Sequence, residues 1–224
     1  MSTSAPDPTA DVSPDAASPA AGGAEGGRKR PKPGERRVQI LQALAAMLEQ
    51  PGAERITTAA LAARLDVSEA ALYRHFASKA QMFEGLIEFI EQSVFGLVSQ
   101  LGEREPDPVV RSRKLVALLL QFAEKNPGMT RVMVGDALVF ENERLQQRMN
   151  LFFDKLEATL RQNLREVAVL SGAATPTVDA QADASVITAF CVGRLQRFAR
   201  SGFKRLPGES LEHSLGLLLP TGRL

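Results

Sequence analysis

Apolar residues recur at helical spacing in two short neighbouring stretches between residues 57 and 83. One stripe comprises Leu61, Ala62 and Leu65, and the other comprises Leu72, Tyr73 and Phe76. Their spacing predicts two helices whose apolar faces pack together. Between them, Asp66 tolerates a left-handed backbone and the Ser68 hydroxyl can cap the next helix. The pattern predicts a helix-turn-helix over about 57–76, with its second helix over 69–76.

The same periodicity continues along the rest of the chain. An apolar face over 35–50 predicts a helix ahead of this motif. The order Ser78-Lys79-Ala80-Gln81 has the spacing of a capping box and opens a long helix. Further helices are expected over 108–125, about 129–134, 142–169, 179–200 and about 209–219. We found no internal repeat and no β-type alternation, so we expect an all-α fold.

Two of the C-terminal helices carry patterns suited to contact with another helix. The expected helix over 142–169 repeats its apolar residues in a seam close to a heptad, which resembles a coiled coil. On the helix over 179–200, Ala182, Ala189 and Gly193 leave small gaps beside larger apolar residues. Small residues there would let a second helix approach closely.

Composition divides the chain into three parts. Residues 1–34 are rich in Ala, Pro and Gly without large apolar groups, so we expect a disordered tail. The basic cluster at its end comprises Arg28, Lys29, Arg30, Lys32, Arg36 and Arg37. Residues 35–80 are expected to form the helix-turn-helix domain. Residues 81–224 are expected to form a helical body for dimerisation and partner binding.

The remaining composition argues against several classes of protein. No apolar run approaches the roughly 20 residues of a membrane helix, and the start lacks the basic and apolar blocks of a signal peptide. The single cysteine, Cys191, fits a reducing cytoplasm and is expected to pack as a small hydrophobe. His75 and His213 lie far apart, and no glycine-rich phosphate loop follows a strand. We therefore expect neither an enzyme nor a metal or other cofactor.

A helix-turn-helix places the first residues of its second helix against base edges in the major groove of DNA. The cations beside that helix are therefore interpreted as contacts to DNA phosphates, against the alternative that each is an ordinary solvated charge. These cations are Arg74, Lys79 and the basic cluster over 28–37, which includes Arg36 and Arg37. Tyr73 and His75 could also donate to phosphates, although Tyr73 could instead pack in the core with its hydroxyl at the surface.

Smaller side chains complete the expected DNA surface. Thr57 and Ser68 stand at the starts of the two helices, where a hydroxyl serves as a helix cap, as part of an anion site, or as both. Ala70 and Ala71 cannot make the bidentate hydrogen bonds that Arg or Asn make to bases, although a methyl group can contact a thymine methyl. We therefore expect limited direct readout, with shape readout carrying part of the specificity.

The run Tyr73-Arg74-His75-Phe76, followed by Ser78-Lys79, resembles the N-terminal domain of TetR-family regulators. The resemblance implies an all-helical subunit with a three-helix DNA-binding head, a body with the dimer interface, and a palindromic DNA target. Over about 37–207, in segments such as LIEFIEQS and AFCVGRLQRFARSGFKRLP, the chain resembles in particular the nucleoid-occlusion factors of this family. That resemblance implies a cytoplasmic, nucleoid-associated homodimer that binds chromosomal DNA and the division GTPase FtsZ together. Such a protein blocks FtsZ assembly over the nucleoid.

By the same resemblance, an FtsZ-contacting surface falls on the long helix after the head and on the next one. Its residues are Phe89, Leu118, Gln121, Lys125 and Asn126. From periodicity alone, Phe89 and Leu118 would be ordinary core residues. An exposed groove with aliphatic sides and a basic rim would suit an extended acidic and apolar peptide. The alternative is a ligand-responsive repressor of the same fold, which would need an enclosed pocket instead.

Overall fold

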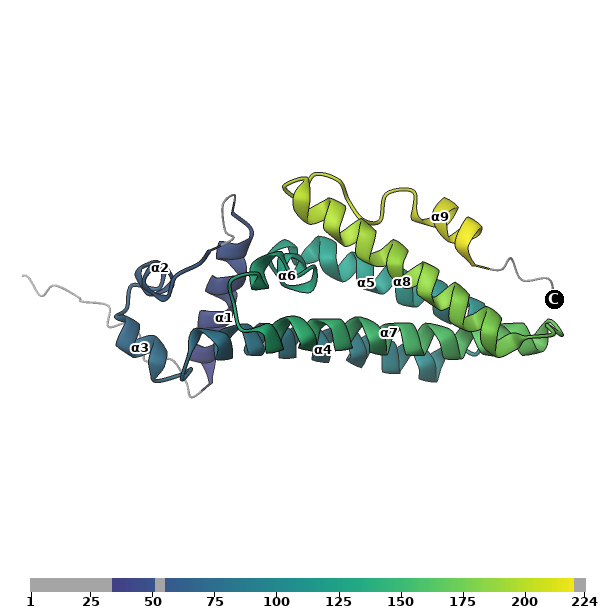
Figure 1. Ribbon diagram of the computed structural model, residues 1–224. Coiled ribbons are helices and arrows are strands. Elements are labelled where there is room, and N and C mark those ends of the chain that lie inside the picture. Colours follow the sequence, from purple (N-terminus) through teal and green to yellow (C-terminus); the bar gives the residue numbers. More distant parts are fainter. Residues whose placement is uncertain (1–33, 51–54, 220–224) are drawn as a thin grey trace, which may run out of the picture. The chain divides into compact units, whose positions relative to one another are not determined.

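The computed structural model describes residues 34–50 and 55–219 (Figure 1). Every regular element in these two stretches is a helix, which confirms the all-α expectation. None of the helices in the described stretches is long and apolar enough to cross a membrane. The tail expected over 1–34 lies outside them, apart from Gly34, so its disorder stays a prediction.

Three short helices form the head: α1, Glu35–Leu48, α2, Thr58–Arg64, and α3, Glu69–Tyr73. The helices α2 and α3 contact each other, and Leu61 and Leu72 of their apolar stripes are buried. Asp66 in the turn between them has a φ of 54°, the left-handed conformation that its short polar side chain tolerates. The expected helix-turn-helix is therefore confirmed.

The helix α3 is shorter than expected, because it ends at Tyr73 rather than at Phe76. The carbonyl of Leu72 accepts from the N–H groups of both His75, at 2.9 Å, and Phe76, at 3.1 Å, which tightens the chain into a turn. Phe76 is buried, whereas Tyr73 is 46% exposed. The expected apolar stripe of this helix therefore lacks Tyr73, which presents its ring at the surface.

The long helix α4, Lys79–Arg104, begins at the expected position. The Oγ atom of Ser78 accepts from the N–H of Gln81 at 3.2 Å, and Gln81 Oε1 accepts from the N–H of Ala77 at 2.8 Å. These reciprocal bonds are those of a capping box, shifted by one residue on the returning side. Because α4 contacts α1 as well as α5, α6 and α7, it joins the head to the body.

The body consists of α5, Pro108–Lys125, α6, Pro127–Met133, the 3-10 turn η1, Asp136–Leu138, α7, Glu143–Leu170, α8, Pro176–Arg200, and α9, Leu211–Leu218. The helices α7 and α8 run back along each other and make the most extensive helix pair in the described stretches (Figure 1). The seam of α7 is buried at Leu145, Met149, Phe152, Leu156 and Leu160. These residues pack within the chain itself, and the coiled coil expected over about 142–169 stays a prediction.

Several helix ends differ from the expected ones by a few residues. The helix α1 ends at Leu48 rather than near residue 50, and α9 begins at Leu211 rather than near residue 209. Pro127 and Pro176 open α6 and α8, which the sequence pattern predicted to begin near residue 129 and at residue 179. Proline suits the first turn of a helix, because the N–H that it lacks would have no helical partner.

The helix α6 lies directly on the backbone of α1. A Cβ atom added at Gly128 would lie 2.0 Å from the carbonyl oxygen of Ala45, closer than any van der Waals contact. Only glycine therefore fits at this crossing. The contact fixes α6 of the body against the C-terminal half of the first head helix.

Candidate nucleic-acid interface and partner surface

Two exposed hydroxyls cap the helices of the helix-turn-helix. Thr57 Oγ1 accepts from the N–H of Ala60 at 3.1 Å, and Ser68 Oγ accepts from the N–H of Ala71 at 3.3 Å. The capping roles of Thr57 and Ser68 are therefore confirmed. Each hydroxyl keeps its own hydrogen free to donate, so a role in binding an anion stays compatible with the cap.

The second helix of the helix-turn-helix, α3, is called the reader helix below, and its surface and that of the turn after it are exposed. The residues that the sequence assigned to DNA here are Ala70, Tyr73, Arg74 and His75, and all four are exposed. The helix α3 is tied to α2 by Thr58 Oγ1, which donates to Glu69 Oε2 at 2.5 Å. Sequence reasoning did not anticipate this bond, because neither residue belongs to an apolar pattern or a cap signature.

Two arginines of α1 differ in what they contact. Arg36 donates from Nη1 to Gln39 Oε1 of its own helix at 2.9 Å. Arg37 donates from Nη1 to the carbonyl oxygen of His75 at 2.5 Å, and its guanidinium carbon lies 4.1 Å from the centre of the Phe76 ring. Arg37 therefore joins α1 to the turn behind the reader helix, in addition to the phosphate role predicted for it.

Lys79, predicted to contact DNA phosphate, forms an ion pair with Glu141. Glu141 belongs to the connection between η1 and α7, 62 residues later in the chain. The side chains of Lys79 and Glu141 are 26% and 11% exposed. No sequence pattern indicated this pair, because it depends on how the body folds back onto the start of α4.

The residues predicted to contact FtsZ are largely accessible. Phe89 of α4 is 47% exposed, so it is not the core residue that periodicity alone favoured. Gln121 and Lys125 of α5 are exposed, and Leu118 is half-buried against the core. Asn126 ends α5, and its Nδ2 donates to the carbonyl oxygen of Phe122 at 2.7 Å.

These residues do not all border one hollow. Gln121 faces a hollow of about 550 Å³ between α5 and the connection from α8 to α9, where Lys204 and Leu206 also lie. A second hollow, of about 240 Å³, lies between the end of α4 and the start of α5 and includes Leu97 and Lys114. Leu97 is 46% exposed, and it extends the apolar surface of α4 beyond Phe89.

The cation at the second hollow is held by a carboxylate. Lys114 Nζ lies 2.6 Å from Glu105 Oε2. Hydrogen bonds from Lys114 and then from the backbone N–H of Asp107 lower the pKa of the Glu105 carboxyl below its ordinary value. Lys125, which has no such partner in the described stretches, is the freer of the two lysines on α5.

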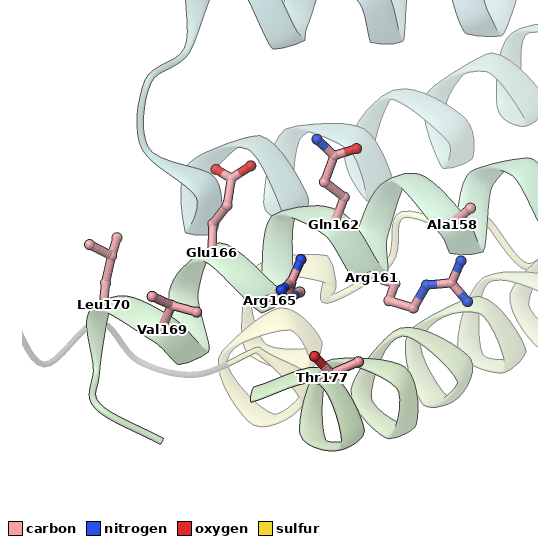
Figure 2. Close-up of a pocket in the computed structure, with 8 residues that line it drawn as sticks. All are labelled: Ala158, Arg161, Gln162, Arg165, Glu166, Val169, Leu170 and Thr177. Carbon is pink, nitrogen blue, oxygen red and sulfur yellow. The ribbon is translucent and has the colours of Figure 1, made fainter. Parts of the chain in front are cut away.

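A larger hollow, of about 1020 Å³, lies on the surface between α7 and α8 (Figure 2). Figure 2 shows Arg161 and Arg165 on the side of α7 nearest Thr177 of α8, and Glu166 on the other side. Glu166 is paired with Arg111 of α5. None of the residues predicted to contact DNA or FtsZ lines this hollow, and it is open to solvent rather than enclosed in the bundle.

One face of α8 exposes the small residues singled out in the sequence. Ala182 and Ala189 are exposed, and Val186 between them is 56% exposed. A Cβ atom added at Gly193 would meet no atom within 4 Å. The face therefore stays open along about three turns of helix.

The described stretches hold no group of histidine, cysteine and acidic side chains that could bind a metal ion. Cys191 is buried on the inner face of α8, which confirms that it packs as a small hydrophobe. Its burial raises the pKa of the thiol to about 12.

Two family models match the chain. The model described as bacterial regulatory proteins of the tetR family matches residues 40–86. The SlmA-like model, described as a tetracyclin repressor-like C-terminal domain, matches residues 106–221. The matches fall on the head with the start of α4 and on the body.

Curated relatives with about half of their residues identical span most of the chain. The nucleoid occlusion factor SlmA of Aliivibrio fischeri is 51% identical over 193 residues, which cover 84% of this chain and 96% of the relative. Those of Vibrio cholerae and Escherichia coli are each 52% identical, and they cover 82% and 79% of this chain and 93% and 89% of the relatives. These names, like those of the family models, indicate no enzyme activity.

Solved structures share the fold at much lower identity. The fatty acid degradation regulator FadR of Bacillus halodurans has a TM-score of 0.69 at 17% identity, with 85% of this chain and 97% of that one covered. The TetR-family regulator PfmR of Thermus thermophilus has a TM-score of 0.64 at 19% identity, with 84% and 97% covered. At such identities the likeness establishes the fold alone.

Proposed function

The chain belongs to the SlmA family of TetR-type proteins and is a nucleoid occlusion factor, and we propose that its head and body divide this work between DNA and FtsZ. Two heads of a homodimer bind a palindromic chromosomal site. The surface on α4 and α5 binds FtsZ, and the DNA-bound dimer disrupts FtsZ polymers over the nucleoid. The protein accordingly acts in the cytoplasm, at the nucleoid.

The observation that carries the proposal is the coexistence of two separate accessible surfaces. In the head, the exposed side of α3 lies beside capped helix starts and exposed cations such as Arg74. In the body, the exposed ring of Phe89 lies on α4, and the exposed cation of Lys125 ends α5. An exposed aromatic ring and an exposed cation suit an acidic and apolar peptide, such as the tail of FtsZ.

A homodimer is supported by the open face of α8. Ala182, Val186 and Ala189 lie four and three residues apart, so they form one stripe along the helix. Small side chains allow a partner helix to come close, and exposed valine gains from burial on association. Dimerisation through this stripe would present two heads to two DNA half-sites.

The alternative, a ligand-responsive repressor, is less well supported by the body. Such a protein needs an enclosed cavity with converging polar groups. The hollow of about 1020 Å³ in Figure 2 lies open on the α7 and α8 surface, with Arg161 and Arg165 at its edge. An open groove of this kind suits a macromolecular surface better than a sequestered small ligand.

The decisive experiment is sedimentation of FtsZ polymers with the purified protein, with and without duplex DNA that carries a selected binding site. We expect polymer loss with the protein, and greater loss when the DNA is present. Polymers that stay intact at every protein-to-FtsZ ratio would refute the division role. Release of the protein from DNA by a small metabolite, with FtsZ unaffected, would favour the repressor.

Charge reversal at Lys125 tests the assignment of surfaces. Lys125→Glu should weaken FtsZ binding and leave DNA affinity unchanged, because Lys125 lies at the end of α5, outside the head. Arg165→Glu, an equal charge change at an exposed position of α7 beside a hollow that includes none of the predicted FtsZ residues, is the matched control. Loss of DNA binding with FtsZ binding intact would show that the two surfaces are assigned the wrong way round.

A further inference from the structure

Glu141 forms an ion pair with Lys79, the cation predicted to contact a DNA phosphate. Lys79 is the first residue of α4, and Glu141 reaches it from the connection ahead of α7. Both border a hollow of about 500 Å³ at the start of α2, together with Arg55, Thr57 and Thr58. Thr57 is the exposed cap of α2, so the ion pair lies beside the surface assigned to DNA.

The ion pair between Lys79 and Glu141 disfavours the binding of a second anion at this position. Among the described residues that border the hollow, Arg55 and Lys79 are the cations and Glu141 is the acid. A phosphate that approaches Lys79 meets the like charge of the Glu141 carboxylate. If Lys79 turns to the phosphate, the carboxylate, only 11% exposed, loses its partner with little solvent to replace it.

The start of α7 is held against α4 by contacts that do not involve Lys79. Two further ion pairs join α7 to α4 beyond Glu141. Arg144 Nη2 lies 2.6 Å from Glu84 Oε1, and Arg148 Nη2 lies 2.5 Å from Glu91 Oε2. These pairs keep the start of α7 in place when Lys79 leaves Glu141. The free-energy cost of that separation therefore falls on the Glu141 carboxylate itself.

We propose that Glu141 occupies Lys79 in the free protein in place of a DNA phosphate and is exchanged for that phosphate on binding. Glu141 is thus a positioning residue that lowers DNA affinity through Lys79. The inference rests on the proposed DNA binding by the head. Glu141, a residue of the body, thereby contributes to the free energy of DNA binding by the head.

A double-mutant cycle tests the exchange. Wild type, Glu141→Gln, Lys79→Ala and the double variant are titrated with a mixed-sequence duplex long enough for two half-sites one helical turn apart. We expect Glu141→Gln to bind up to about fivefold more tightly per head at low salt. Its plot of log affinity against log salt should be steeper by up to about 0.9 for each head, because in the wild type the freed Glu141 carboxylate takes up a salt cation that offsets the one released from the phosphate. In the Lys79→Ala background, Glu141→Gln should change neither quantity beyond the control.

The matched control is Glu143→Gln, which removes the same charge two residues further on. Glu143 is exposed and accepts from Gln147 within α7, away from Lys79. An equal gain from Glu143→Gln, or a gain from Glu141→Gln that persists without Lys79, would overturn the exchange in favour of a general charge effect. Unchanged affinity and salt dependence in Glu141→Gln would also overturn it. Absence of duplex binding by the wild type would instead refute the proposed function.

Discussion

Arg37 of α1 holds the end of the reader helix through the carbonyl oxygen of His75, 38 residues later in the chain. The same guanidinium stacks over the ring of Phe76, which leaves the helix and enters the core. The two contacts use the planar shape of the group, which lysine lacks. Arg37 is therefore both a cation predicted to contact DNA and an anchor for the turn that ends α3.

Arg37→Lys separates these two roles. Lysine keeps the charge but loses the fork and the stacking, so we expect the free energy of unfolding to fall by about 1 kcal/mol. DNA affinity should fall as well, because the reader helix loses its anchor. Thermal unfolding and DNA titration measure the two effects. Arg36, which among the described residues bonds only within α1, provides the control variant Arg36→Lys. Equal behaviour of the two variants would show that Arg37 contributes only its charge.

Gly128→Ala tests the contact between α6 and α1. The added methyl would meet the backbone oxygen of Ala45, which cannot move aside as a side chain would, so we expect a loss of about 2 kcal/mol or more in the free energy of unfolding. Gly96→Ala in the exposed part of α4 meets no atom within 4 Å and should stabilise the protein by about 0.5 kcal/mol. Urea unfolding compares the two. Effects of the same sign would contradict the close crossing.

Local patterns were sufficient to predict most of the fold. The helix over Pro108–Lys125 has the expected ends, because Pro108 opens it and Asn126 with Pro127 closes it, signals that act within a few residues. The reader helix was predicted too long, since the tight turn after Leu72 and the bond from Arg37 depend on packing across the head. Local signals therefore located helices better than they fixed the ends that tertiary contacts decide.

In the candidate site, too, local signals predict some contacts, whereas the fold of the whole chain decides others. The caps at Thr57 and Ser68 are visible in the sequence, because the cap and the N–H groups it serves are three residues apart. The partner of Lys79 cannot be predicted from the sequence, because the fold of the whole body brings Glu141 to it. The exposure of Phe89 was equally hidden, since an apolar side chain at helical spacing carries no mark that it faces solvent.

The thiol of Cys191 provides a test of burial that depends on pH. Its pKa is about 12 in the folded chain against 9.0 for the free group, so the folded thiol keeps a proton that the unfolded one loses. This contribution to stability is complete below about pH 9 and is lost as the pH rises towards 12. We expect native protein at pH 8 to resist a thiol reagent that labels the urea-unfolded chain at once. Rapid labelling of the native protein would contradict the buried position.

Ala189→Arg tests whether the open stripe of α8 is the dimer interface. Ala189 lies in the middle of the stripe, three residues after the exposed Val186 and four before Gly193, so a long charged side chain would hold a partner helix away and bury its charge without a partner. Because the residue is exposed in the single chain, its replacement should not unfold the protein. We expect sedimentation equilibrium to show monomers and binding to a palindromic duplex to weaken by far more than tenfold, since each head then binds alone. Ala174→Arg, exposed in the connection between α7 and α8, adds the same charge outside the stripe and should remain dimeric. A dimeric Ala189→Arg protein would move the interface to another face of the body.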